Sequence, residues 1–274
     1  MTKDQIIKLL HGNADAAAWA DAAMGILPKY EINTPKRIAG FFAQCGHESM
    51  NFTALSENLN YRAETLEKLF SKYFSKAGRN AADYAKQPEK TANIIYGGRM
   101  GNVQEGDGYR FRGRGVIQLT GRDNYTAFGK SVGMSPEQVI DYVQTKKGAL
   151  ESACWYWNSR NINAACDTND IVKMTKLVNG GTIGLEDRRK HYEQALAVLG
   201  GAVPAPITHA EAIPGVLKKG STGENVKRLQ AELGLEGDGV FGPGTESAVK
   251  KWQAANGLAA DGIVGPKTLA KLLA

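Results

Sequence analysis

The sequence predicts a mainly α-helical chain in which a large domain is followed by a small one. Three observations support this prediction. Apolar residues recur at helical spacing before residue 200, residues 201–216 are poor in charge and rich in Gly, Pro and Ala, and the C-terminal part contains an internal repeat. With 274 residues, the chain also exceeds a usual single domain of about 150 residues. We therefore expect domains at 1–200 and 217–274, joined by a semi-rigid linker at 201–216.

A helix is predicted to begin after Thr34, a helix-capping residue, with Pro35 in its first turn. Its apolar face consists of Ile38, Phe41, Phe42 and Cys45. Glu48 prolongs the edge of this face near the C-terminal end of the helix. Partial desolvation and the negative end of the helix dipole both favour a neutral carboxylic acid there, which is the form that a proton donor needs.

Glu57 has a different local sequence, because Ser56 and Asn58 flank it in a polar stretch. We expect its carboxyl group to stay ionised. Glycoside hydrolysis requires such a division, with one carboxyl group to protonate the leaving oxygen and another to activate water or attack the sugar. Glutamate is also common on solvated helix faces, so Glu48 and Glu57 alone do not establish catalysis.

Residues 109–125 combine basic, small and amide side chains around a few apolar ones, a mixture that suits a sugar-binding groove. Gly113 allows close approach of the backbone, Gln118 and Asn124 can pair with hydroxyl and acetamido groups, and Tyr125 offers a ring face to a pyranose. The same stretch is equally consistent with a strand or turn that has a basic rim.

An aromatic-rich helix is predicted at 149–157, ending in Trp155, Tyr156 and Trp157. We expect these rings to pack in the core rather than to stack on sugars.

The C-terminal repeat consists of Asp238–Thr245 and Asp261–Thr268, which lie 23 residues apart. Each copy pairs a glycine-rich turn with a Thr cap and a following amphipathic helix. The predicted helices of this domain are 223–233, 246–252 and 269–273. Neither copy has the ligand series of a calcium-binding EF-hand loop, so we expect no calcium there.

Four motifs follow one another in order over about residues 30–195. They are Gln44–Ser49, Ser56–Tyr61, Gly113–Gly121 and Val178–Gly181, with Arg188 beyond. Together they resemble glycoside hydrolase family nineteen and, more narrowly, the short phage endolysins of this chitinase-like and lysozyme-like family. The resemblance implies a lysozyme-like, helical catalytic domain.

The resemblance also implies an inverting hydrolase, with Glu48 as the acid and Glu57 as the base. Thr120 matches a residue that helps the base hold the attacking water. Inversion itself depends on a carboxylate separation of about 6.5 to 9.5 Å, a distance that sequence spacing does not give.

Further positions match residues that contact substrate in the family. They are Gln118, Asn124, Tyr125 and Asn179. Arg188 matches an arginine that the family uses near the carboxylates, and a fixed cation there would help to keep Glu57 ionised.

Residues 217–274 closely resemble the three-helix peptidoglycan-binding module found at the ends of many cell-wall hydrolases. A tethered binding domain raises the local concentration of an enzyme on an insoluble polymer. The resemblance implies bacterial peptidoglycan as the partner, without naming the contact residues.

The net charge of +6 favours an anionic partner such as peptidoglycan, which carries peptide carboxylates. No helix-turn-helix, zinc-finger or RNA-binding signature is present, so we expect no nucleic-acid partner. The four histidines are scattered, and His47 lacks a second histidine at zincin spacing, so we expect neither a metal nor a cofactor. We expect His47 to pack beside the site or to hydrogen-bond Glu48. Cys45 and His47 lie two residues apart on the predicted helix, so their side chains do not face each other. The pair therefore does not predict a Cys–His peptidase.

The cellular context can also be predicted. Cys45, Cys154 and Cys166 do not form an even disulfide framework, which indicates reduced thiols. The N-terminal apolar stretch is too short for a signal peptide, and no segment approaches the roughly 20 apolar residues of a transmembrane helix. We expect a monomer made in the host cytoplasm, without stable membrane insertion, that reaches the wall after a separate holin-type protein has opened the membrane.

The sequence therefore predicts an endolysin that hydrolyses peptidoglycan glycan strands as an N-acetylmuramidase. A lytic transglycosylase, a chitinase and an inactive wall-binding protein remain alternatives. Glu57 with Thr120 separates hydrolysis from transglycosylation, because only hydrolysis needs a held water.

Overall fold

The computed structural model describes residues 1–201 and 216–272. The chain divides into two compact units, Met1–Val203 and Pro204–Ala274. Apart from its first and last residues, the linker predicted at 201–216 lies outside the described residues. None of the described helices is both long and apolar enough to cross a membrane.

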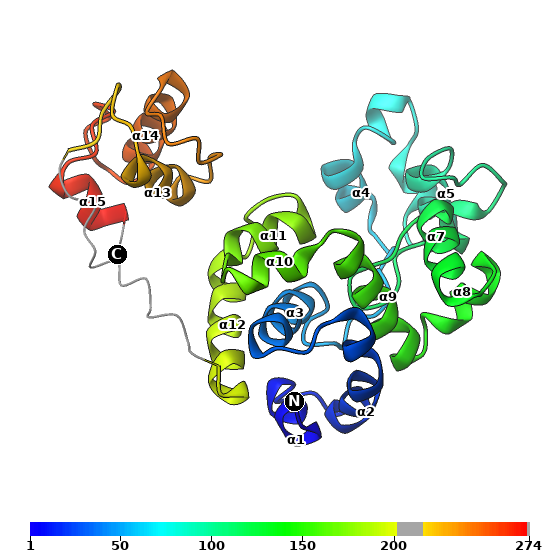
Figure 1. The fold of residues 1–274 in the computed structure, drawn as a ribbon. Coiled ribbons are helices and arrows are strands. Elements are labelled where there is room, and N and C mark those ends of the chain that lie inside the picture. Colours follow the sequence, from blue (N-terminus) through cyan, green and yellow to red (C-terminus); the bar gives the residue numbers. More distant parts are fainter. Residues whose placement is uncertain (202–215, 273–274) are drawn as a thin grey trace. The chain divides into compact units, whose positions relative to one another are not determined.

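The first unit consists of short helices arranged around a central one (Figure 1). Its described residues form isolated β-bridges but no strand. The α-helices are α1 (Lys3–Leu9), α2 (Ala16–Ile26), α3 (Pro35–Glu48), α4 (Ala63–Phe70), α5 (Pro88–Tyr96), α6 (Asp107–Arg110), α7 (Arg122–Val132), α8 (Pro136–Tyr142), α9 (Lys146–Ser159), α10 (Ile162–Asp167), α11 (Ile171–Asn179) and α12 (Leu185–Leu199). Three short 3₁₀ helices accompany them, namely η1 (Leu27–Tyr30), η2 (Ser75–Ala77) and η3 (Ala81–Tyr84).

Helix α3 lies in the middle of the largest core and confirms the predicted helix. The Thr34 hydroxyl caps it by accepting a hydrogen bond from the Arg37 backbone N–H, and proline occupies the first turn. Every residue of 38–45 is buried, because α10, α11 and α12 all pack against this helix. Burial ends at residues 46–48, which are half-buried. The helix therefore passes through the close-packed core and places Glu48, its last residue, at an accessible surface.

A second lobe of the first unit has two smaller cores of its own. The core beneath α7 and α8 contains Phe111, Leu119, Tyr125, Phe128, Val139 and Val143. The core beneath α4 and η3 contains Leu66, Phe74 and Ala81. Residues 111–121, which contribute Phe111 and Leu119 to the first of these cores, form a turn rather than a strand. Isolated bridges pair Arg114 with Ser56 and with Leu119, which attaches the Glu57 segment to this turn.

The aromatic residues of α9 pack in the core, as predicted. Trp157 is fully buried, and its ring meets Phe41 edge-on with a centroid separation of 5.3 Å. Trp155 packs against Phe128 in the second lobe. Helix α9 therefore contributes Trp157 to the largest core and Trp155 to the core beneath α7 and α8.

The second unit contains α13 (Glu224–Glu232), α14 (Pro243–Ala255) and α15 (Pro266–Leu272), close to the three helices predicted from the sequence. Leu273, the last residue of the predicted third helix, lies outside the described residues. The apolar core of the second unit is small and contains Leu217, Val226, Leu229, Phe241, Val249 and Val264.

One buried glutamine precedes each copy of the internal repeat in the sequence and binds residues of that copy. The Gln230 side-chain amide donates to the Asp238 carboxylate and the Thr245 hydroxyl, and its carbonyl accepts from the Gly239 N–H. Gln253 repeats these contacts with Asp261, Thr268 and Gly262. The prediction of Thr caps is wrong, because both threonines lie inside their helices and bind the glutamines. Asp238 and Asp261 therefore stabilise the glycine-rich turns of the two copies.

The three cysteines carry free, buried thiols, as expected for reduced side chains. Burial raises the pKa of the Cys45 and Cys154 thiols and raises that of Cys166 to about 12. These thiols therefore stay protonated and pack as small apolar groups.

Candidate active site

The Glu48 carboxylate is held by a buried arginine of α12. Arg188 is 1% exposed, and its Nη2 lies 2.5 Å from Oε1 of Glu48. Its Nη1 donates to the side-chain carbonyl of Gln44 at 2.6 Å, one helical turn earlier on α3. Oε2 of Glu48 accepts no hydrogen bond from the described residues, and the side chain is 27% exposed. One oxygen is therefore fixed while the other remains available to a ligand.

The position of Arg188 corrects one expectation. Its guanidinium binds Glu48. From the sequence, we expected this cation to help keep Glu57 ionised. The third contact of Arg188 runs from Nε to the Ile183 carbonyl, which also accepts from the Asn179 side chain at 3.1 Å. Asn179, Arg188 and Glu48 therefore form one group at the ends of α3, α11 and α12.

Glu57 is held by two donors, one for each carboxylate oxygen. The Gly113 N–H donates to Oε1 at 2.5 Å, and the Tyr96 hydroxyl donates to Oε2 at 2.7 Å. Burial, followed by the hydrogen bond to Glu57, raises the pKa of Tyr96, so this hydroxyl keeps the proton that it donates. Because each carboxylate oxygen accepts one of these bonds, the two donors fix the orientation of the Glu57 side chain.

Three predicted side chains converge on Gly113. A methyl group added there would lie 2.5 Å from Oε1 of Gln118, 3.1 Å from Oγ1 of Thr120 and 3.4 Å from Oε1 of Glu57. The Thr120 hydroxyl donates to the Gln118 carbonyl at 2.9 Å, which leaves its lone pairs free to accept. Glu57, Thr120 and Gln118 thus form a second group around Gly113, whose missing side chain leaves room for them.

Asn124 belongs to the same group, but Tyr125 does not. The exposed Asn124 side chain donates to the Thr120 carbonyl at 2.8 Å. Tyr125 is fully buried, so the prediction that its ring faces a sugar is wrong. Its hydroxyl donates to the Arg112 carbonyl and accepts from Arg114. Tyr125 therefore stabilises the turn at residues 111–121 from its buried side.

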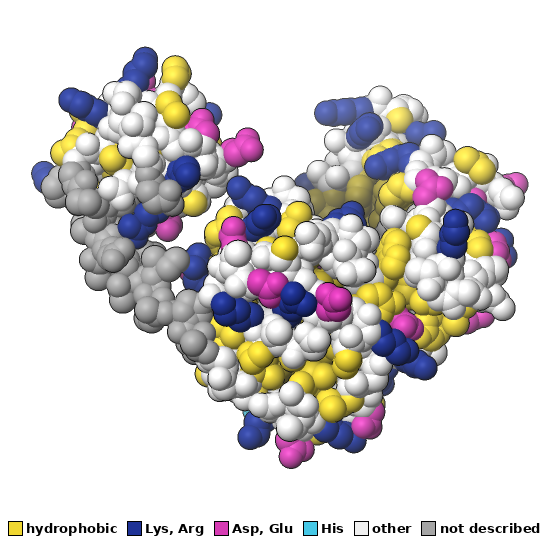
Figure 2. All heavy atoms as spheres, in the orientation of Figure 1, with side chains coloured by type: hydrophobic (Ala, Val, Ile, Leu, Met, Phe, Trp, Pro, Cys, Tyr) yellow, Lys and Arg dark blue, Asp and Glu magenta, His cyan; other side chains and the backbone are white. Residues whose placement is uncertain are grey.

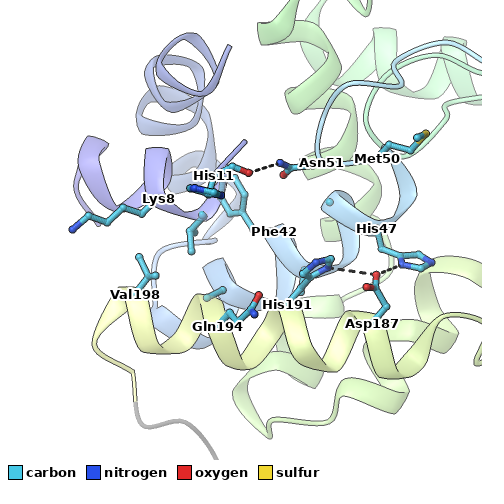
Figure 3. Close-up of a pocket in the computed structure, with 14 residues that line it drawn as sticks. Lys8, His11, Phe42, His47, Met50, Asn51, Asp187, His191, Gln194 and Val198 are labelled. Carbon is cyan, nitrogen blue, oxygen red and sulfur yellow. Dashed lines mark hydrogen bonds and ion pairs between the residues drawn. The ribbon is translucent and has the colours of Figure 1, made fainter. Parts of the chain in front are cut away.

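His47 and Asp187 form a second contact between α3 and α12, directly beside the pairing of Glu48 with Arg188. Nδ1 of His47 lies 2.6 Å from Oδ2 of Asp187, and His191 approaches the same oxygen at 3.5 Å (Figure 3). Of the two positions expected for His47, the structure shows the one beside the site and not the hydrogen bond to Glu48. The hydrogen bond with His47 lowers the pKa of Asp187. All three residues line a pocket of about 450 Å³ between α1, α3 and α12.

Sequence reasoning missed Tyr96, Gln44 and Asp187 as members of the site. Gln44 belongs to the recognised 44–49 motif, and its spacing of four residues from Glu48 places both on one helix face, which was an available signal. No local pattern marks Tyr96 as a partner of Glu57. Among the described residues, no group of three or more His, Cys, Asp or Glu side chains is arranged to hold a metal ion.

A protein from Haemophilus influenzae, described as "Glycosyl hydrolase family 19 domain-containing protein", is 42% identical to this chain over 158 residues. The match covers 56% of this chain and 76% of that protein. The chain belongs to glycoside hydrolase family 19. This confirms the family inferred from the four motifs and makes the chain a glycoside hydrolase.

Other comparisons concern solved structures and the second unit. Chitinase C from Streptomyces griseus is 19% identical, with a TM-score of 0.49, over 74% of this family 19 chain and 78% of that chain. A class IV chitinase from Zea mays is 17% identical, with a TM-score of 0.46, over 74% and 92% of the two chains. The family assignment rests on the Haemophilus relative and not on these structures.

Residues 222–272 match the family model "Putative peptidoglycan binding domain".

Proposed function

We propose that this family 19 hydrolase is an endolysin that cuts the glycan strands of bacterial peptidoglycan, with N-acetylmuramidase specificity. The observation that supports it best is the contrast between the two carboxylates. Glu48 has one oxygen on a buried guanidinium and one available, whereas Glu57 accepts a donor on each oxygen. The match of residues 222–272 to a peptidoglycan-binding model supports the wall polymer as substrate.

Glu48 acts as the general acid. A proton carried on Oε2 is free to pass to the glycosidic oxygen, because the described residues leave that oxygen unbonded. As the proton leaves, negative charge develops on a carboxylate that already lies 2.5 Å from Arg188. A preorganised cation stabilises such charge without reorganisation, so Arg188 lowers the barrier to proton donation.

Glu57 acts as the general base. Each of its oxygens has one lone-pair direction left after accepting from Gly113 or Tyr96. A water between Glu57 and the Thr120 hydroxyl would donate to the carboxylate and to the threonine oxygen. This position beside Gln118 and Thr120 agrees with the water-holding role expected from the family resemblance.

The reaction is then a single displacement. Glu48 gives its proton to the leaving oxygen as the bond from that oxygen to C1 of the sugar breaks. Water attacks C1 from the opposite face while Glu57 takes its proton. The products are a new 4-hydroxyl group and a reducing end of inverted configuration.

Amide substitutions test the two roles. Glu48→Gln and Glu57→Gln keep the side-chain shape but cannot donate or accept the catalytic proton, and we expect activity on purified sacculi to fall by about 10² to 10⁴-fold in each. The measurement is the release of new reducing ends, with circular dichroism to establish folding. Glu105→Gln, an exposed residue, is the matched control. A folded Glu48→Gln protein with wild-type activity would remove Glu48 from the mechanism.

The endolysin role includes a proposed route to the substrate. We propose that the protein is made in the cytoplasm of an infected cell and reaches the wall after a separate holin-type protein permeabilises the membrane. Lysis of cells from within should then require coexpression of such a membrane protein, whereas added enzyme should lyse permeabilised cells alone.

A further inference from the structure

Three cations surround Tyr73 on the lobe that carries α4 and α5. Arg99 donates from Nη1 to the Tyr73 hydroxyl, and its guanidinium carbon lies 5.7 Å from the ring centroid. Nζ of Lys72 lies 5.6 Å from the same centroid. Arg79 donates from Nη1 to the Tyr73 carbonyl at 3.1 Å. We call Lys72, Tyr73, Arg79 and Arg99 the Tyr73 cluster.

Within the described part of the chain, the positive charge of the Tyr73 cluster has no acidic partner. Within residues 1–201 and 216–272, no carboxylate lies within 4.0 Å of the Lys72, Arg79 or Arg99 nitrogens. All three cations are exposed. Each guanidinium uses only Nη1 in hydrogen bonds to described residues, so the other edge of each planar group is free to bind a carboxylate through two parallel bonds.

The Tyr73 cluster is connected to the candidate active site through α5. Arg99 lies three residues after Tyr96, the donor to Glu57, and its Nη1 also binds the Ile95 carbonyl. Figure 2 shows Lys and Arg side chains gathered beside α4, at the edge of a hollow that separates this lobe from the side of α10 and α11. Hydrophobic side chains form the floor of the hollow. A polymer lying in the hollow would therefore pass close to exposed cations.

We propose that the Tyr73 cluster binds carboxylates of the peptide stems that project from a peptidoglycan strand held at Glu57. The inference rests on the proposed function, because it names the part of that substrate which this lobe recognises. Chitin carries no carboxylates, so the cluster would favour a peptidoglycan strand over a chitin strand. An exposed patch of like charge also speeds the approach of an anionic polymer.

The test compares two charge-neutralising variants of the full chain. Lys72→Gln/Arg79→Gln/Arg99→Gln removes the Tyr73 cluster. Lys130→Gln/Lys147→Gln/Lys190→Gln removes three exposed lysines of α7, α9 and α12 and changes the net charge equally. A third variant, Arg79→Lys/Arg99→Lys, keeps the charge but loses the planar fork. Thermal unfolding followed by circular dichroism establishes that each variant is folded.

Two substrates separate charge recognition from bond cleavage. One is purified sacculi, and the other is sacculi whose carboxylates have been converted to amides with a carbodiimide and ammonium. The glycosidic bonds are the same in both. On native sacculi at low salt, we expect the cluster variant to lose about tenfold in kcat/KM, since a few exposed charge contacts contribute about 1.4 kcal/mol together. The loss should shrink toward twofold or less at about 0.5 M salt because of screening.

On amidated sacculi, the cluster variant and wild type should be equally active. The lysine control should match wild type on both substrates, and the Arg-to-Lys variant should show an intermediate loss on native sacculi only. An equal loss by the cluster variant on native and amidated sacculi would overturn the proposal, and so would an equal loss in the lysine control. If wild type cleaves neither substrate, the proposed function fails instead, which is a distinguishable result.

Discussion

Tyr96 and Glu57 lie 39 positions apart in the sequence, yet the Tyr96 hydroxyl is one of the two donors that fix the Glu57 carboxylate. The other donor, the Gly113 N–H, is 56 positions away. A base that waits in the correct orientation avoids reorganisation during the reaction. The geometry therefore makes Tyr96 a positioning residue for the proposed base.

Tyr96→Phe tests this role. The ring fills the same space while the donor to Glu57 is lost, and a hydrogen bond to a charged group contributes about 1.5 to 3 kcal/mol. We expect kcat on sacculi to fall about 10- to 100-fold with a small change in KM. Tyr84→Phe in the same lobe is the control, because the Tyr84 hydroxyl makes no hydrogen bond to a described residue. An unchanged kcat in Tyr96→Phe would show that the Gly113 N–H suffices.

Two residues show what the sequence could not predict at this scale. Arg188 was recognised as a site residue, but its partner is Glu48, 140 positions away, and no local pattern distinguishes Glu48 from Glu57 as that partner. Tyr125 lies in a polar motif, yet α7 turns its ring into the core with Phe111, at a centroid separation of 5.2 Å. Helix direction after a turn depends on tertiary packing, which the motif does not contain.

At the scale of elements, α3 was predictable because its signals are local. The Thr34 cap, the proline in the first turn and the apolar spacing all lie within the helix. The pairing of α3 with α12 was not predictable, although it places two contacts side by side, Glu48 with Arg188 and His47 with Asp187. These contacts fix the C-terminal end of α3, where the proposed acid lies.

The turn that carries Gly113 and Thr120 is anchored at both ends by one ion pair. Asp107 of α6 is 1% exposed, and its carboxylate accepts two bonds from Arg122, the first residue of α7, at 2.7 and 3.0 Å. The hydrogen bond from Arg122 lowers the pKa of Asp107. A carboxyl group whose pKa is lowered by folding stabilises the fold at pH values above 3.8, its pKa in the unfolded chain. This stabilisation is lost as the pH falls through the lower pKa of the folded protein.

Asp107→Asn should therefore destabilise the first unit at pH 7. We expect the free energy of unfolding to fall by about 2 to 3 kcal/mol, because Arg122 loses its buried partner but keeps Glu137. The difference from wild type should shrink as the pH falls below 3.8, because the carboxyl group becomes protonated first in the unfolded chain and then in the folded protein. Urea unfolding at pH 7 and pH 3 measures both effects, with the exposed Asp141→Asn as control. A difference that is equal at both pH values would contradict the ion-pair account.

At the scale of the whole molecule, the two-part organisation was predictable from composition and repetition. The repeat located α14 and α15, because each copy places a turn before a helix. The reason for the repeat was not predictable. Gln230 and Gln253 precede their turns in the sequence, and only the folded unit shows that each one gathers an aspartate, a glycine and a threonine. Such contacts act across a turn and leave no periodic pattern.

The most direct test of the central claim is mass spectrometry of the muropeptides that the full chain releases from purified sacculi, after borohydride reduction of the new ends. We predict reducible N-acetylmuramic acid ends, the product of water attacking a muramyl C1. Reducible N-acetylglucosamine ends would keep the hydrolytic roles of Glu48 and Glu57 but refute muramidase specificity. Nonreducible 1,6-anhydro ends would contradict the account, because they form without the water that Glu57 and Thr120 are proposed to hold.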